Sequence, residues 1–232
     1  MREICDAGHL LTRQSLSILM TLESVTGRPV AHQPKYQRRK EDRPQEIADA
    51  AFATFAEKGY AATRIDDVAR RAGVSKGLTY LYYRTKEDLF KAVVRSVVVR
   101  RVDALIGDVE TTEMTSEEFI RGPLLAFMKK VPGSPIAIVI RLLISEGARH
   151  PDLVEYYYEN VVARGLGAIR KFIERGVERG EFRREALDLQ PHLFLAPMML
   201  SMIWRLIFTN KKLDTDDLME SQVDMLLAQL RA

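Results

Sequence analysis

The chain has 232 residues, 47% hydrophobic and 29% charged, which is ordinary for a soluble globular protein and excludes a fibre or a largely disordered chain. Its single cysteine, Cys5, excludes an internal disulfide framework and a multi-cysteine metal site, which suits a reducing cytoplasm. The net charge of +3 is unevenly distributed: residues 35–101 hold sixteen Lys and Arg against nine Asp and Glu, whereas residues 102–232 hold sixteen against twenty.

Residues 1–34 are predicted to be a flexible extension, because Gly27, Pro29 and Pro34 break the chain before the folded part. Polar residues interrupt the apolar runs there, so no signal peptide is predicted. The most apolar stretch, residues 193–207, contains proline and arginine and is shorter than the roughly twenty apolar residues that a bilayer requires. We therefore expect a cytoplasmic protein with no membrane partner.

The segregated charge points to a polyanion as the partner of the N-terminal part. Five basic side chains lie within residues 35–43, an arm that can rest against phosphate or in a minor groove. A solvated basic surface explains the same residues equally well, so charge alone does not decide between the two interpretations.

Residues 44–58 are predicted to form a first helix, since Pro44 is favoured in a first helical turn and Gly59 supplies a stop. Its apolar residues fall at helical spacing on one face: Ile47, Ala48, Ala51, Phe52 and Phe55. A second helix follows, for which Thr63 offers the cap. This helix ends at Gly73.

The sharpest local signal is the turn at residues 72–75. Gly73 can adopt the positive φ that ends a helix, Val74 can pack between two helices, and Ser75 can cap the next helix. The pattern predicts a helix-turn-helix, whose second helix can lie in a major groove. A glycine turn between helices is common, however, so this signal alone does not establish DNA recognition.

The second helix of this pair, residues 76–83, carries side chains suited to DNA. Lys76 can pair with phosphates, while the hydroxyls of Tyr80 and Tyr82 can bond phosphate oxygens and their rings can rest on sugars or thymine methyls. The alternative for each tyrosine is a packing role, which we favour for Tyr83. Thr85 then caps a linking helix that occupies residues 85–101.

Over residues 47–93 the sequence resembles the tetracycline-repressor (TetR) family of bacterial regulators. The most specific stretch reads TRIDDVARRAGVSKG at residues 63–77, and a gap-free set of matches follows it: Tyr80, Tyr82, Tyr83, Thr85, Lys86, Glu87, Leu89 and Phe90. The resemblance implies an all-α fold. A three-helix helix-turn-helix head, residues 35–84, would be joined by the linking helix to a helical ligand-binding and dimerisation domain, residues 102–232.

The resemblance also implies which residues bind DNA. It places Thr63 and Arg64 at the backbone-facing start of the second helix, and Lys86 at a position that commonly touches phosphate. The groove-facing residues of the third helix are Lys76, Gly77, Leu78, Tyr80 and Tyr82. The family usually has Phe at Tyr83 and Leu at Thr79, and the second departure leaves open whether Leu78 or Thr79 faces outward.

The rest of the chain resembles the family only in outline. Periodicity predicts helices over residues 117–131, 135–149, 151–180, 187–209 and 215–230, and the short loop between the last two makes them antiparallel neighbours. Residues 193–208 are apolar nearly all round, so more than one side must be covered. Core packing accounts for about half of that surface, and we expect a homodimer interface through the two C-terminal helices to cover the rest.

An effector pocket is expected between the helices of the second domain, where bundles usually bind ligands. The candidate lining residues are Phe119, Phe127, Met128, Leu143, Tyr157, Phe172, Met198 and Trp204. Core packing is the stronger alternative for each of these side chains. Their apolar character points to an apolar or amphipathic small-molecule effector, whose identity the sequence leaves unknown.

Catalytic and metal chemistry are not indicated. The four histidines share no i, i+3 or i, i+4 spacing that would place two ligands on one helix face. The chain has no glycine-rich phosphate loop, nucleophile elbow or HExxH sequence. We therefore expect no metal, no cofactor and no enzymatic activity.

The sequence thus favours a ligand-responsive transcriptional regulator, with repression favoured over activation. A homodimer would place two recognition helices in successive major grooves of a pseudo-palindromic double-stranded DNA operator, roughly 34–36 Å apart. Effector binding would favour a state with the wrong head spacing and so release the DNA. The alternative is a small-molecule-binding or adaptor protein whose helix-turn-helix does not read DNA, and an enzyme comes third.

Overall fold

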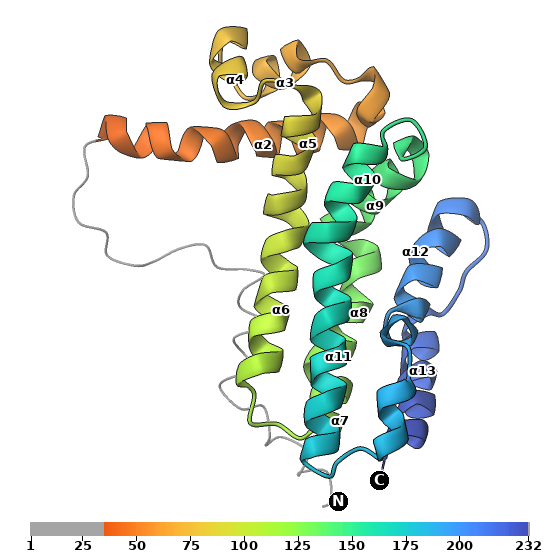
Figure 1. Cartoon of the computed structure of the whole chain (residues 1–232). Coiled ribbons are helices and arrows are strands. Elements are labelled where there is room, and N and C mark those ends of the chain that lie inside the picture. Colours follow the sequence, from red (N-terminus) through yellow and green to blue (C-terminus); the bar gives the residue numbers. More distant parts are fainter. Residues whose placement is uncertain (1–34, 232) are drawn as a thin grey trace, which may run out of the picture.

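The computed structural model describes residues 35–231, and every regular element within that range is helical. The predicted extension, residues 1–34, lies outside the described residues. Three helices form a head: α2 (Lys35–Ala62), α3 (Ile65–Arg71) and α4 (Lys76–Tyr82). Figure 1 shows this head lying across one end of a body of longer helices, which confirms the predicted all-α fold with a helix-turn-helix head.

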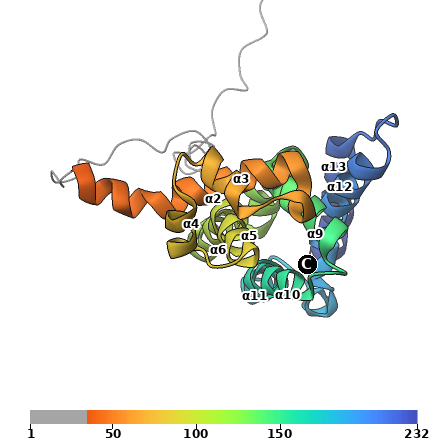
Figure 2. The ribbon, with the colours of Figure 1, turned by 90° about the horizontal axis from the view of Figure 1, so that it is seen from above.

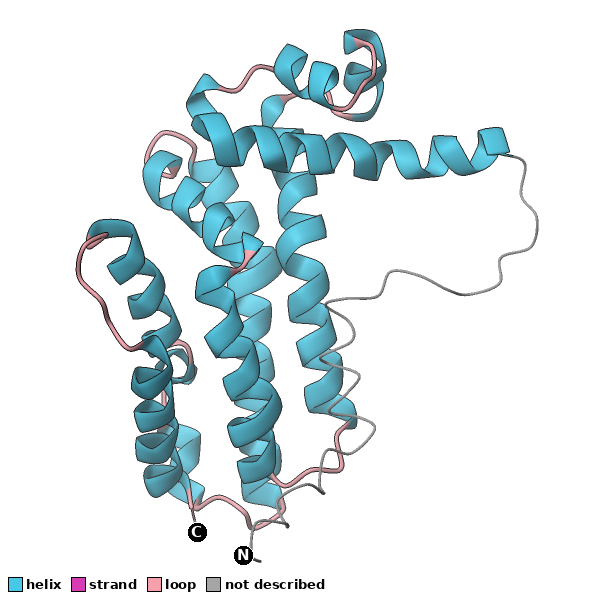
Figure 3. Ribbon diagram, turned by 180° about the vertical axis from the view of Figure 1, so that it is seen from behind, coloured by secondary structure: helices cyan, strands magenta, loops and turns pink. Residues whose placement is uncertain are grey.

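The body consists of helices that run along its long axis and are joined by short loops (Figure 3). In chain order they are α5 (Lys86–Val94), η1 (Arg95–Val99), α6 (Arg100–Thr111), α7 (Ser116–Phe119), η2 (Ile120–Leu124), α8 (Leu125–Lys130), η3 (Val131–Gly133), α9 (Pro135–Glu146), α10 (Pro151–Tyr157), η4 (Tyr158–Val162), α11 (Ala163–Glu178), η5 (Arg184–Asp188), η6 (Pro191–Phe194), α12 (Ala196–Ile207) and α13 (Thr215–Leu230). Viewed from above, α12 and α13 stand on the side of the body away from the start of α2 (Figure 2).

Helix α2 begins earlier than predicted. Residues 35–43, expected as a basic arm, are helical, because most of them are residues of good helix propensity. Pro44 therefore lies inside the helix, where its carbonyl accepts a hydrogen bond from the Tyr83 hydroxyl at 2.9 Å. At the other end Gly59 has φ 79°, so the regular helix is broken at the predicted residue.

The turn between α3 and α4 has the predicted geometry. Gly73 adopts φ 64°, and the Ser75 hydroxyl accepts a hydrogen bond from the Leu78 amide at 3.2 Å. Thr85 caps α5 in the same way, because its hydroxyl accepts from the Asp88 amide at 3.0 Å. These local signals confirm the helix-turn-helix and fix where the linking helix begins.

The linking helix is longer than predicted. Elements α5, η1 and α6 keep right-handed helical backbone angles across their junctions and run on to Thr111, well beyond residue 101. Two arginines interrupt the apolar pattern at the predicted end, but Val102, Leu105 and Val109 resume it and pack against the body. The helix that starts in the head therefore continues as part of the body.

Lys86 holds the C-terminal end of α2. Its Nζ donates to the Tyr60 carbonyl at 2.9 Å and to the Ala61 carbonyl at 3.2 Å, and it lies 4.4 Å from the centroid of the Tyr60 ring. The last carbonyls of a helix have no partner within the helix, and a cation there also offsets the negative end of the helix dipole. Lys86 thus fixes the linking helix to the end of α2.

The body reaches the same end of α2 through two further residues. Arg141 of α9 donates to the Ala56 carbonyl at 3.1 Å, and the His150 ring meets the Tyr60 ring edge-on, with 4.9 Å between centroids. We call Tyr60, Lys86, Arg141 and His150 the head–body joint. Burial raises the pKa of the Tyr60 hydroxyl, so this ring stays neutral in the joint.

The long predicted helix of residues 151–180 is present as α10, η4 and α11, and its glycines do not break it. Gly176 is required there, because a Cβ at this position would lie 2.2 Å from Cδ2 of the buried Phe182 ring. Helix α13 matches the predicted bounds. The helix predicted over residues 187–209 is shorter: α12 starts only at Ala196, since Pro191 and Pro197 restrict the preceding segment to short 3-10 turns.

No single helix between residues 35 and 231 has the length and apolar composition needed to cross a membrane. One pair of helices, Ser116–Gly133 and Pro135–Glu146, meets those criteria only when its two members are taken together, and they are bent by 59°.

We expect Gly176→Ala to lower the free energy of unfolding by about 1–3 kcal/mol, since the added methyl would overlap the Phe182 ring. Gly167→Ala in the same helix is the matched control, because nothing lies within 4 Å of a Cβ added there. The control should raise the free energy of unfolding by up to about 1 kcal/mol through helix propensity. Urea denaturation followed by circular dichroism measures both, and equal effects would contradict the packing argument.

Candidate nucleic-acid interface and internal cavity

Helix α4 presents one exposed face and one buried face. Lys76, Gly77, Tyr80 and Leu81 are exposed, whereas Thr79 is fully buried. Leu78 is half-buried, so the structure turns Thr79 toward the core and leaves Leu78 nearer the surface. The face that a nucleic acid can reach therefore carries a cation, a phenol and an aliphatic side chain.

Lys76 is held over the exposed face by its neighbours. Its Nζ lies 2.8 Å from Oδ1 of Asp66 on α3 and 5.9 Å from the centroid of the Tyr80 ring. The hydrogen bond to Asp66 raises the pKa of Lys76, so the side chain remains a cation. Since both partners are exposed, an incoming phosphate can replace the carboxylate at little cost.

Two residues predicted to touch DNA have other contacts in the structure. The Thr63 side chain is buried, and its hydroxyl donates to the Gly59 carbonyl at 2.7 Å. It is Arg64, exposed to solvent, that forms the N-cap of α3, so the predicted Thr63 cap is wrong by one residue. Lys86 directs its amino group at α2, which gives it a positioning role in the joint.

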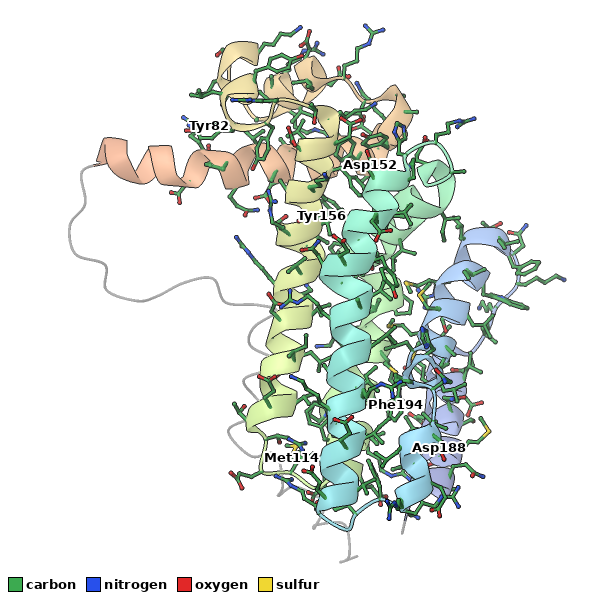
Figure 4. All side chains as sticks on the ribbon, in the orientation of Figure 1. Tyr82, Met114, Asp152, Tyr156, Asp188 and Phe194 are labelled. Atoms are coloured by element: carbon green, nitrogen blue, oxygen red, sulfur yellow. The ribbon has the colours of Figure 1, made fainter. Side chains whose placement is uncertain are left out.

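Leu81 was not predicted from the sequence, although its side chain is 74% exposed on α4. It lies four residues after Gly77, and residues at that spacing share one helix face. Tyr82, which was predicted to face the groove and is labelled in Figure 4, is half-buried and lines a surface pocket together with Arg84 and Lys91. Helical spacing could therefore have placed Leu81 on the exposed face.

The body encloses a cavity of 640 Å³ between α6, α9, α11 and the segment from η6 to α12. Its lining is almost entirely aliphatic and aromatic. Six of the eight predicted lining residues line it: Phe119, Phe127, Leu143, Tyr157, Phe172 and Met198. The lining residues that the sequence did not predict include seven from α6 and α9: Val102, Leu105, Ile106, Val109, Ile136, Ile140 and Ile144.

Two predicted lining residues, Met128 and Trp204, do not line the cavity. Met128 is buried in the core, whereas the adjacent residue Phe127 lines the cavity. Trp204 packs against Phe208 with 4.5 Å between ring centroids, and its Nε1 donates to the Lys211 carbonyl at 2.9 Å. Met128 is therefore a core residue, and Trp204 has its contacts around the end of α12.

The cavity lining is exposed in one part and buried in another. The lining residues Ile144, Val154 and Met199 are partly exposed to solvent. The lining residues Phe119 and Phe172 are 1% and 3% exposed, and their ring centroids lie 5.4 Å apart. A ligand in the cavity can therefore have one part near solvent and another part deep among the helices.

Polar groups are few in the cavity. Tyr157 lines it, and burial raises the pKa of its hydroxyl to about 12, so the phenol stays neutral. Phe194, which Figure 4 labels between α11 and α13, closes another part of the wall and is 1% exposed. An uncharged chain is the group that such a lining accommodates at least cost.

Three π-helical turns border the cavity. Val98 in η1, Leu124 in η2 and Val161 in η4 each contribute a lining side chain. Turns of this type interrupt the α-helical register and are frequent at functional sites. Because η1 belongs to the linking helix, that helix carries both Lys86 in the head–body joint and Val98 in the cavity wall.

Two family descriptions match the chain. "Bacterial regulatory proteins, tetR family" matches residues 47–93, and "Tetracyclin repressor-like, C-terminal domain" matches residues 120–226. The uncharacterized HTH-type transcriptional regulator YhgD of Bacillus subtilis (strain 168) is 39% identical over 172 residues, which cover 74% of this chain and 85% of YhgD.

Solved structures show the same fold. A TetR-family transcriptional regulator from Mesorhizobium loti MAFF303099 has a TM-score of 0.70 at 22% identity, covering 86% of this chain and all of that one. The transcriptional regulator FadR from Bacillus subtilis, solved with stearoyl-CoA, has a TM-score of 0.63 at 21% identity and covers 80% and 98% of the two chains. The chain therefore belongs to the TetR family of transcriptional regulators, which bind DNA and are not enzymes.

Proposed function

We propose that this regulator is a homodimeric repressor that leaves its operator when an effector with a long apolar chain fills the cavity. The observation that carries the proposal is the linking helix, α5 to α6. Its first residue, Lys86, holds the head, and its later residues, from Val98 to Val109, form a wall of the cavity. A change in the cavity wall and a change in head position are therefore linked through one helix.

The DNA-binding part of the proposal rests on the exposed face of α4. Lys76 and Tyr80 lie on it and supply a cation and a phenol, the groups that contact phosphate and base edges. Arg64 stands exposed at the start of α3 and adds a second cation toward the phosphate backbone. A pseudo-palindromic operator follows from the proposed two-fold dimer, with half-sites about one helical turn apart.

The proposed dimer interface is the outer face of the two C-terminal helices. In the single chain, α12 and the residues around it leave several large apolar side chains partly exposed outside the cavity: Leu193, Leu200, Ile203, Leu206, Ile207 and Phe208. Monomeric proteins rarely expose so many apolar side chains in one patch. In a dimer with a two-fold axis, this face of one chain would pack against the same face of the second chain, so that each covers the other.

The proposed effector class follows from the cavity. Its 640 Å³ lies within the range of small-molecule sites, and its lining offers dispersion contacts but few hydrogen bonds. The structural neighbour FadR was solved with stearoyl-CoA, which carries such a chain. These two facts support an effector with a long hydrocarbon chain.

Release would proceed through the head–body joint. Helix α9 lines the cavity with Ile140 and Leu143, while Arg141 between them reaches α2. A ligand that displaces α9 therefore also shifts the hydrogen bond between Arg141 and the Ala56 carbonyl of α2. Such a ligand releases the DNA only if it binds the DNA-free state more tightly than the DNA-bound state.

We expect Tyr80→Ala and Lys76→Ala each to weaken operator binding by roughly tenfold, since each removes a contact from the exposed face of α4. The operator would be obtained by selection from a random DNA pool, and affinity measured by fluorescence anisotropy. Arg170→Ala, an exposed cation on α11 far from the head, is the control for net charge. Selection of no sequence at all would favour the adaptor alternative, and dissociation of the variants to monomers in sedimentation would show a structural role.

We expect Gly165→Phe to weaken binding of stearoyl-CoA by roughly tenfold, because Gly165 lines the cavity and open space surrounds the position of an added Cβ. Gly167→Phe, two residues on and outside the cavity lining, should leave the affinity unchanged. Isothermal titration of the DNA-free protein measures both. Equal affinities of the two variants would place the ligand elsewhere.

We expect Arg141→Met and His150→Leu to uncouple the effector from DNA. Operator affinity without effector should stay within about twofold, while the loss of operator affinity caused by stearoyl-CoA should shrink by roughly tenfold. Arg149→Met, an exposed arginine one residue before His150, is the control. A full effector response in both joint variants would show that the signal takes another path.

A further inference from the structure

Among the described residues, two polar side chains line the cavity, those of Tyr157 and His192. The other lining residues are glycine or carry an aliphatic, phenylalanine or methionine side chain. His192 is exposed, so its ring can stay in contact with solvent when the cavity is filled. Tyr157 is half-buried at the end of α10, and its hydroxyl is therefore the polar group that a ligand in the cavity separates from water.

The Tyr157 hydroxyl has no hydrogen-bond partner within residues 35–231. Burial alone raises its pKa to about 12, and no charged side chain contributes to that shift. Its oxygen is not among the buried unpaired atoms of the described residues, so a molecule in the cavity can reach it. The cavity wall thus offers one neutral O–H donor for which the protein supplies no acceptor.

Tyr157 lies between the exposed and the buried part of the cavity lining. Val154, three residues earlier, lines the cavity and is 42% exposed, whereas Val161, four residues later, lines it and is buried. Residues three or four apart share one face of a helix, so the three side chains follow one another along the same wall. The hydroxyl-bearing residue is therefore one helical turn inside the exposed part of the lining.

The wall beyond Tyr157 is long enough for an extended hydrocarbon chain. Phe172, in the buried part of the lining, follows Tyr157 by fifteen residues, which corresponds to about 22 Å of helix. The lining residues between them on η4 and α11 are glycine or aliphatic. A chain that starts beside Tyr157 can therefore extend among apolar side chains as far as the Phe172 ring.

We infer that Tyr157 determines effector specificity by donating a hydrogen bond from its hydroxyl to the carbonyl oxygen of an acyl group, whose hydrocarbon chain extends toward Phe172. A carbonyl oxygen accepts a hydrogen bond without carrying a charge, so it suits a neutral donor in an apolar wall. An alkyl chain without that oxygen would displace water from the hydroxyl and leave it unpaired. This inference rests on the proposed function, which supplies the long apolar chain.

An acyl group can enter the cavity as a coenzyme A thioester or as a free carboxylic acid. Both compounds carry the carbonyl oxygen on the first carbon of the chain. In both, the charged head would lie on the side of Tyr157 where Val154, Ile144 and Met199 are partly exposed. A charged head keeps its contact with water there, which avoids the cost of burying it.

The test is isothermal titration of the full-length protein with stearoyl-CoA, stearate and S-octadecyl-CoA. The last compound is a thioether with the same carrier and the same number of chain carbons, but it lacks the carbonyl oxygen. We expect the wild type to bind stearoyl-CoA roughly fivefold more tightly than S-octadecyl-CoA, because only the thioester accepts the hydrogen bond. Tyr157→Phe should bind stearoyl-CoA and stearate roughly fivefold more weakly than the wild type and S-octadecyl-CoA equally well.

Tyr156→Phe is the matched control. It removes the same hydroxyl from the preceding residue, which is labelled in Figure 4 and does not line the cavity. The Tyr156 ring, whose centroid lies 5.4 Å from Nζ of Lys91, is kept in this variant. We expect it to retain the wild-type preference for the thioester over the thioether.

Three other results would overturn the inference, and they separate it from the proposed function. Equal affinities of the wild type for stearoyl-CoA and S-octadecyl-CoA would reject the hydrogen bond but keep the apolar effector. Equal losses for all three compounds in Tyr157→Phe would show that the hydroxyl supports only the shape of the cavity. Wild-type protein that binds none of the three would reject the proposed effector class and this inference together.

Discussion

The architecture depends on how the last carbonyl groups of α2 are satisfied. Gly59 breaks the helix, and the carbonyls around it then need donors from outside it. Thr63 supplies one from the next segment, Lys86 supplies another from the linking helix, and Arg141 supplies a third from the body. Because these donors come from three different parts of the chain, the end of α2 is the point at which head, linker and body are held in one arrangement.

This arrangement places two demands on the linking helix. At its start it must keep Lys86 on α2, and farther along it must present aliphatic side chains to the cavity. A cavity of this size removes dispersion contacts that a packed core would have, so it lowers stability. A ligand that binds there restores those contacts and thereby favours whichever helix position fits it better.

The sequence predicted the parts of this molecule that depend on near neighbours. Gly73, Ser75 and Thr85 act on adjacent residues, and the helix-turn-helix followed from them. The role of Lys86 could not be predicted, because its acceptors lie 25 and 26 residues away in the chain. Periodicity found the apolar side chains of the helix predicted over residues 117–131 but could not separate cavity from core, which is why Phe127 was placed correctly and Met128 was not.

The three π-helical turns around the cavity affect how this domain can change between relatives. Each such turn takes up one residue more than a regular α-helical turn, so removing one residue there would restore α-helical hydrogen bonding while the following segment keeps its facing. After η1, Val102, Leu105 and Val109 would still face the cavity, and the change would be confined to the residues of the turn itself. Ligand preference on this scaffold can therefore diverge through insertions and deletions of single residues at these turns, as well as through exchange of side chains.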